Sequence, residues 1–131
     1  MRGFNDVERA VRAGDSQRAG AALARTWDDV VAHFASEEAL MDGLGYPERN
    51  GHRTAHHLFL EDLRALVREH AANGLGEDVA AWAVQRLPEW LAFHIQTNDA
   101  PLARFAARVA ARDLVRNAMG EPAPERKRQE S

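Results

Sequence analysis

The chain has 131 residues and a mass of 14.6 kDa, and its 45% hydrophobic and 28% charged residues are typical of one soluble globular domain. A net charge of −3 without a long basic stripe argues against nucleic acid or an anionic membrane as a partner. The absence of cysteine excludes disulfides, thiolate metal sites and iron–sulfur clusters. No apolar run approaches the roughly 20 residues that span a bilayer, and the N-terminus lacks the layout of a secretory signal. We therefore expect a cytoplasmic protein.

The sequence pattern indicates helices and no strands. Breaks that contain glycine separate four segments, and each segment carries apolar residues at helical spacing. The predicted helices cover residues 3–13, 16–42, 48–72 and the stretch from residue 77 onward. Short connections between successive helices favour antiparallel neighbours. The sequence therefore predicts an all-α fold, with an up-down four-helix bundle over residues 1–117 and a truncated first helix.

Two prolines interrupt the fourth predicted helix. Pro88 is expected to kink this helix or to mark a restart, because proline lacks the N–H that a helix interior needs. Pro101 is expected to make a second break, before a short C-terminal helical extension over residues 102–119. Residues 118–131 include two prolines and a short run of charges, and we expect them to form a disordered polar tail.

Histidines and acids recur at helical spacing in the middle of these helices. His33 and Glu37 are four residues apart, as are His52 and His56, and this spacing puts both members of a pair on one helix face. Each pair alone is weak evidence, and an ordinary ion pair is as good an interpretation of the first. Together the pairs place polar groups inside apolar stripes, where an unpartnered group costs several kcal/mol. A metal centre supplies such partners, and imidazole with carboxylate suits iron, manganese or zinc.

Two further histidines and one acid are assigned to ordinary roles. An isolated histidine on a helix face is usually partly exposed or hydrogen-bonded, and we expect this of His57 and His70. Glu38, next to Glu37, is expected to face solvent.

Four runs of the sequence form a combined pattern. They are His33-Phe34-Ala35-Ser36-Glu37-Glu38-Ala39-Leu40-Met41, Gly45-Tyr46-Pro47, His52-x-x-x-His56-x-x-Phe59 and Trp90-Leu91-x-x-His94-Ile95-x-x-x-Asp99. This combination resembles the signature of bacterial hemerythrins, and the resemblance spans residues 3–111. It implies a four-helix bundle around a non-haem di-iron centre that binds dioxygen reversibly.

The resemblance also implies roles for individual residues. Glu37 and Asp99 would bridge two iron ions, and the histidines would be terminal ligands. The implied ligand set is His33, Glu37, His52, His56, His94 and Asp99. The implied apolar dioxygen pocket is formed by Phe34, Trp90, Leu91 and Ile95.

The spacing of His94 and Asp99 does not fit a regular α-helix. Residues five apart lie about 140° apart around an ideal helix, so Asn98 would be better aligned with His94. Either the turn is widened, as in π-type bulges at functional sites, or Asp99 is not a ligand. Pro101 is close enough to permit such a distortion. We favour Asp99, because an anionic bridge between two cations is worth more than a neutral amide.

One ligand of the family pattern is missing. Members carry a further terminal histidine on the first helix, whereas the first histidine here is His33. The segment Phe4-Asn5-x-Val7 resembles the stretch after that ligand, which would lie at or just before Met1. Either the recorded start is internal, which we favour because a short first helix leaves apolar faces uncovered, or one iron keeps only His33, two carboxylates and solvent. Formation of a homo-oligomer is another way to cover the exposed faces.

The resemblance favours a non-enzymatic protein that binds dioxygen as a carrier, store or sensor. A di-iron oxidase or iron-handling protein is the first alternative, and consumption of dioxygen with a reductant would distinguish it. A degenerate, metal-poor bundle that acts as an interaction module is the second. The metal content after purification separates that module from the other two.

Overall fold

The structure is a computed structural model that describes residues 2–120. Every regular element in this range is a helix, so the predicted all-α class is confirmed. The first three helices are α1 (Arg2–Arg12), α2 (Ser16–Leu44) and α3 (Arg49–Asn73), each within two residues of its predicted bounds. The rest of the helical chain comprises α4 (Glu77–Ala81), η1 (Trp82–Arg86), α5 (Leu87–His94), η2 (Ile95–Asp99) and α6 (Ala100–Ala118). The tail expected at residues 118–131 falls almost entirely outside the described range.

Local capping interactions set the ends of α2. The Asp15 carboxylate accepts a hydrogen bond from the Arg18 N–H at 3.0 Å, which satisfies one of the free donors at the start of the helix. Gly45 ends α2 in the left-handed conformation, with φ of 63°, and its N–H bonds back to the last turn. His70 of α3 contacts the Ser16 carbonyl at 2.9 Å, so it is hydrogen-bonded as expected, and His57 is exposed.

The segment from Glu77 to Ala118 is one continuous helix, which corrects the expected breaks at the prolines. Two five-residue π-helical segments, η1 and η2, interrupt its α-helical geometry. Pro88 and Pro101 lie just after these segments, in the first turns of α5 and α6. A π turn widens the helix by one residue and bonds each N–H to the carbonyl five residues back. This widening takes up the disturbance that proline introduces, so neither proline breaks the helix.

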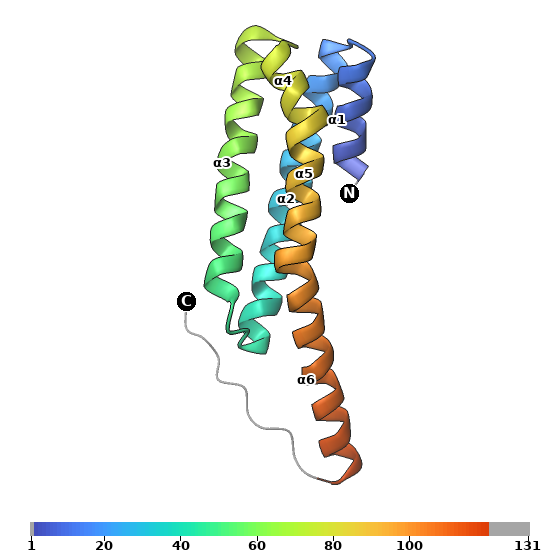
Figure 1. Cartoon of the computed structure of the whole chain (residues 1–131), viewed down its shortest axis with the longest axis vertical. Coiled ribbons are helices and arrows are strands. Elements are labelled where there is room, and N and C mark those ends of the chain that lie inside the picture. The colour runs from blue at the N-terminus through green and yellow to red at the C-terminus, as the bar shows by residue number, and fades with distance from the viewer. Residues whose placement is uncertain (1, 121–131) are drawn as a thin grey trace.

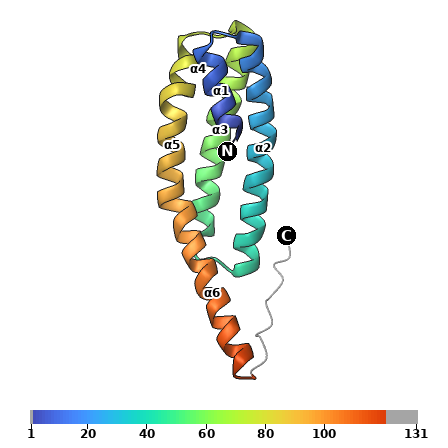
Figure 2. The same cartoon turned by 90° about the vertical axis from the view of Figure 1, so that its right-hand side faces the viewer.

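The long helices lie side by side along the long axis of the molecule (Figures 1 and 2). The short α1 packs beside α2 and η1, near the turn between α3 and α4. α6 continues past the turn between α2 and α3 and projects from the other helices. No helix among residues 2–120 is long and apolar enough to cross a membrane.

Two apolar clusters fill the space between the helices. The larger one joins α1, α2, α3 and the helix that begins at α4, and it includes Phe34, Phe59 and Trp82. The smaller one consists of Met41, Tyr46 and Leu102, with Phe105 packed against it. Along α2, Phe34 belongs to the first cluster and Met41 to the second. Glu37 lies on α2 between Phe34 and Met41, so a polar residue stands where the two apolar clusters meet.

Candidate metal centre

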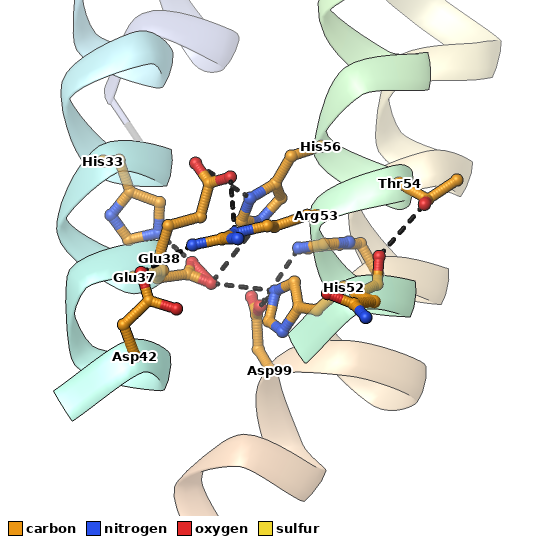
Figure 3. A network of polar contacts seen from close by, with 11 residues as sticks. His33, Glu37, Glu38, Asp42, His52, Arg53, Thr54, His56 and Asp99 are labelled. Carbon is orange, nitrogen blue, oxygen red and sulfur yellow. Dashed lines mark hydrogen bonds and ion pairs between the residues drawn. The ribbon is translucent and has the colours of Figure 1, made fainter. Parts of the chain in front are cut away.

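Four side chains from three helices converge at this junction. Glu37 comes from α2, His52 and His56 from α3, and His94 from the end of α5. One ligand atom of each lies within 4.8 Å of the corresponding atoms of the others. The three histidines are at most 3% exposed. The i, i+4 spacing on α3 places both of its imidazoles on the same face, opposite the Glu37 carboxylate (Figure 3).

The π segment η2 brings Asp99 to the same place. Asp99 Oδ1 lies 3.1 Å from His94 Nε2 and 3.3 Å from His52 Nε2. The extra residue in the turn offsets the 140° separation of residues five apart, so His94 and Asp99 face the same point. The widened turn predicted from the spacing is therefore confirmed, and Asp99 reaches the cluster.

His33 lies at the solvent-facing edge of the cluster. Its Nε2 is 3.0 Å from Glu37 Oε2, and its side chain is 50% exposed. Glu37 thus contacts His33 with one carboxylate oxygen and His52 with the other, at 3.1 Å. The structure brings together all six residues predicted as ligands. The cluster has a buried end, formed by His52, His56 and His94, and an exposed end, formed by His33.

The polar atoms of the cluster fit a metal site better than a hydrogen-bond network. In the part of the chain that the structure describes, the following buried atoms have no hydrogen-bond partner: both oxygens of Glu37, both ring nitrogens of His52, His56 and His94, and Asp99 Oδ1. Such groups are costly to bury without a partner, and native proteins contain few of them. The Nε2 atoms of the three histidines and the oxygens of Glu37 and Asp99 lie close together, and a cation can bind several of them at once. Nitrogen and oxygen donors without sulfur suit iron, manganese or zinc.

The carboxylates of the cluster are held in the ionised form. Burial would raise the pKa of Glu37, but contacts with His52 and His56 outweigh burial and lower the pKa. Burial likewise opposes ionisation of Asp99, yet His52 and His94 keep the pKa of Asp99 well below its usual range. Deprotonated carboxylates are the form that binds metal ions.

The histidines respond to this environment in opposite directions. Burial lowers the pKa of His56, in spite of the nearby Glu37. For His52, burial is outweighed by Asp99 and Glu37, which raise its pKa to about 9. In the metal-free protein, His52 is therefore protonated at neutral pH and pairs with the two carboxylates. A metal ion must displace this proton when it binds.

We predict that the metal-free protein loses stability as the pH rises from 6.5 to about 9. A histidine with a raised folded-state pKa stabilises the fold fully below its unfolded value of 6.5, and this contribution is lost as the pH passes its folded value of about 9. The lowered pKa values of Glu37, Asp99 and His56 act at lower pH, outside this window. Thermal unfolding of the chelated protein checks the prediction, with His52→Gln expected to flatten the profile and the exposed His57→Gln to preserve it. A melting temperature that stays constant or rises over this window contradicts the prediction.

A cavity of about 160 Å³ opens beside the cluster. Its wall includes His33, His94 and Asp99, together with Phe4 of α1. All four residues of the predicted apolar pocket line it: Phe34, Trp90, Leu91 and Ile95. A small apolar molecule in this cavity would therefore touch three of the candidate ligands.

Aromatic rings pack directly against the candidate ligands. Phe34 stacks on His56 with ring centroids 3.7 Å apart and planes within 5° of parallel. Trp90 stacks on His94 at 4.5 Å and 12°. These contacts fix the imidazole planes and keep the buried side of the cluster dry.

Glu38 and Arg53 contribute to the site, which the sequence did not predict. The Glu38 side chain is only 27% exposed, so the expectation that it faces solvent is corrected. Its carboxylate lies 4.0 Å from His56 Nδ1 and 3.5 Å from Arg53 Nε, and Arg53 contacts Asp42 at 2.6 Å (Figure 3). Glu38 and Asp42 are four residues apart on α2, with a basic residue next to His52 on α3. This spacing of charged residues is the only feature of the sequence that indicates the contact, and it does not show that α2 and α3 meet at these residues.

We predict that Glu38→Ala weakens metal binding by about 10- to 100-fold, the usual effect of removing a carboxylate behind a histidine ligand. The variant removes the carboxylate that lies 4.0 Å from His56 Nδ1, so the negative charge behind this imidazole is lost. Competition with a chelator measures the affinity. Glu38→Gln, which keeps an acceptor oxygen, should lose less, and Glu61→Ala on the exposed face of α3 should change nothing. An affinity of Glu38→Ala within twofold of the unmodified chain contradicts this role.

Comparisons with known proteins agree with the geometry. The family described as Hemerythrin HHE cation binding domain matches residues 1–106. A bacteriohemerythrin of Pseudomonas paraeruginosa is 33% identical over 94 residues, which are 72% of this chain and 54% of the relative. The bacteriohemerythrins of Stenotrophomonas maltophilia and Ralstonia nicotianae are 34% identical over 83 residues and 35% identical over 77 residues. These matches cover 60% and 57% of this chain, and 52% and 53% of the relatives.

The chain spans about half the length of the curated relatives it matches. No solved structure gives a significant match. The family match nevertheless covers most of the chain, including all six residues predicted as ligands. This chain therefore belongs to the hemerythrin family.

Proposed function

We propose that this protein holds two non-haem iron ions in the cluster and binds dioxygen reversibly, as a carrier, store or sensor, without being an enzyme. The observation that carries the proposal is the set of buried nitrogen and oxygen atoms that face one another without hydrogen bonds, beside an apolar cavity. Membership of the hemerythrin family supports iron as the metal. When bound, a pair of ferrous ions supplies the electrons that dioxygen takes up and gives back.

The positions of the side chains suggest how the iron ions would be held. His52, His56 and His94 would be terminal ligands at the buried end, and His33 at the exposed end. Glu37 would bridge, since it contacts histidines at both ends. Asp99 contacts His52 and His94 at the buried end and lines the cavity together with His33, and it would be the second bridge, as the resemblance to hemerythrins implies. Their ionised carboxylates would offset the charge of the metal ions. We further propose that the helices form an up-down bundle closed around this centre.

The cavity would give dioxygen its binding place. Phe34, Trp90 and Leu91 present apolar surface, so the cavity favours a small apolar molecule over water. This apolar surface would also limit the entry of water, which would slow the protonation and loss of reduced dioxygen. His33 would be the nearest ligand to solvent, because its side chain is half exposed. This exposed end is where dioxygen would enter.

The exposure of His33 also favours a second candidate, a di-iron oxidase or iron-handling protein. One histidine at the solvent-facing end leaves that end open to water and reductants. The two candidates differ in the fate of dioxygen: the first returns it and the second consumes it.

Anaerobic loading with Fe(II), followed by absorption spectra, tests the proposal. Exposure to dioxygen should produce a visible band that disappears when dioxygen is removed and returns on the next exposure. A band that persists as a ferric spectrum, with steady consumption of dioxygen in the presence of a reductant, would favour the oxidase. A protein that shows no band and retains no iron would contradict both.

A further inference from the structure

One residue of α1 reaches the cavity beside the metal cluster. This cavity of about 160 Å³ is lined mainly by α2, α5 and η2, and among residues 2–120 its only lining residue from α1 is Phe4. In Figure 2, α1 lies over the space between α2 and α5, with its N-terminal end pointing along these helices. Phe4 therefore adds a third side to a cavity whose other two sides belong to α2 and to the helix that runs from α5 into η2.

Packing alone holds the Phe4 ring in this wall. Phe4 is 6% exposed, and its ring packs edge-on against Phe59, with centroids 6.0 Å apart and an angle of 63° between the planes. Both residues belong to the larger apolar cluster. A phenylalanine side chain makes no hydrogen bond that would fix its place, so the depth of the ring in the wall depends on how closely α1 packs against α2.

The residue before Phe4 sets that closeness. Gly3 lies against Thr26 of α2, and a Cβ atom at Gly3 would be 2.6 Å from Thr26 Oγ1 and 3.3 Å from Thr26 Cα. Thr26 is 1% exposed, and its hydroxyl donates a hydrogen bond to the Ala22 carbonyl at 2.7 Å, so the side chain cannot turn away without losing that bond. Glycine is therefore the residue that lets α1 and α2 approach this closely.

We propose that Phe4 closes the cavity to water and makes it a site for a small uncharged apolar molecule, and that the contact of Gly3 with Thr26 holds α1 at the depth this wall needs. Apolar cavities of about 150 Å³ stay dry and bind ligands such as xenon. That the natural occupant is dioxygen rests on the proposed function, whereas closure by Phe4 does not.

Xenon binding to the metal-free protein tests the closure. Methyl NMR signals of Leu91 and Ile95, which line the cavity, should shift saturably with xenon pressure. Phe4→Ala should raise the dissociation constant about tenfold, because xenon loses apolar contact and must displace water. Phe4→Leu, which keeps most of the apolar surface, should lose less. The matched control is Phe93→Ala, which removes an exposed phenylalanine outside the cavity and should bind as the unmodified chain does.

Gly3→Ala tests the helix contact, because it leaves Phe4 in place. Alanine is a better helix former than glycine, so weaker xenon binding in this variant would come from the close contact and not from a weaker helix. We expect Gly3→Ala to raise the dissociation constant about as much as Phe4→Ala does. Adding Thr26→Ala, which removes the Oγ1 atom at the contact, should restore most of the affinity. Gly43→Ala, at a helical glycine with open space around it, should bind as the unmodified chain does.

In the iron-loaded protein, Phe4→Ala and Gly3→Ala should both speed conversion to the ferric form, since water would enter the cavity. Absence of saturable xenon binding in the unmodified chain, or an unchanged affinity in Phe4→Ala, overturns the closure. An unchanged affinity in Gly3→Ala, or a double variant that binds no better than Gly3→Ala, overturns the role of the helix contact. A chain that retains no iron refutes the proposed function alone, because the xenon titration is made without metal.

Discussion

Replacing Glu37 with alanine is expected to lower the iron retained after anaerobic loading from two ions per chain to one or none. Glu37 contacts His33 through one oxygen, at 3.0 Å, and His52 through the other, at 3.1 Å. It therefore links the exposed and buried ends of the cluster. Its removal also takes away a negative charge that would face both cations, in a site with little water to replace it.

Three comparisons separate loss of the bridge from loss of the fold. Glu37→Gln keeps the volume but not the charge, and it should also fail to retain two iron ions. Glu61→Ala, on the exposed face of α3, should retain both. The helical content of the metal-free Glu37→Ala chain should be unchanged, because the carboxylate makes no hydrogen bond that holds a helix. Retention of two iron ions by Glu37→Ala would show that Glu37 is not the bridge.

Phe34→Ala is expected to be the most destabilising change at the site, with a loss of about 3–5 kcal/mol in the free energy of unfolding, as is usual for a buried phenylalanine. Phe34 is 4% exposed, stacks on His56 and packs edge-on against Phe59. Truncation would leave a void among three helices and would also enlarge the cavity beside the cluster. Urea unfolding of the metal-free protein measures the loss.

The functional effect of Phe34→Ala follows from the same void. Water would enter the enlarged cavity, so we expect the oxygenated, iron-loaded variant to convert to the ferric form at least tenfold faster. Phe34→Leu, which fills most of the space, should lie between the variant and the unmodified chain. Leu58→Ala removes a side chain that is 59% exposed and should change stability by no more than about 0.5 kcal/mol. A loss below 1 kcal/mol for Phe34→Ala would mean that Phe34 is not part of the packed core.

The helix bounds followed from the sequence wherever glycine ends a helix. Gly45 and Gly74 adopt positive φ values at the ends of α2 and α3, a conformation that other residues rarely take. Pro88 and Pro101 were misjudged, since a proline in sequence looks like a break. The structure places a π turn before each one, and for the turn before Pro88 the sequence carries no separate signal.

The shared helix face of candidate ligands such as His52 and His56 was predictable from their i, i+4 spacing, whereas the full candidate set was implied by the resemblance to hemerythrins. The widened turn at Asp99 followed from the conflict between its spacing and its expected role. Glu38 and Arg53 were missed because their contact depends on the rotation of α2 against α3, which no pattern within one helix records.

The most direct test of the proposed centre is anomalous diffraction at the iron edge from crystals of the anaerobically loaded protein. We predict two iron peaks about 3–4 Å apart. Both should lie within ligand distance of Glu37, one beside His52, His56 and His94 and the other beside His33. A single peak, or peaks away from these residues, would contradict a di-iron centre in this chain.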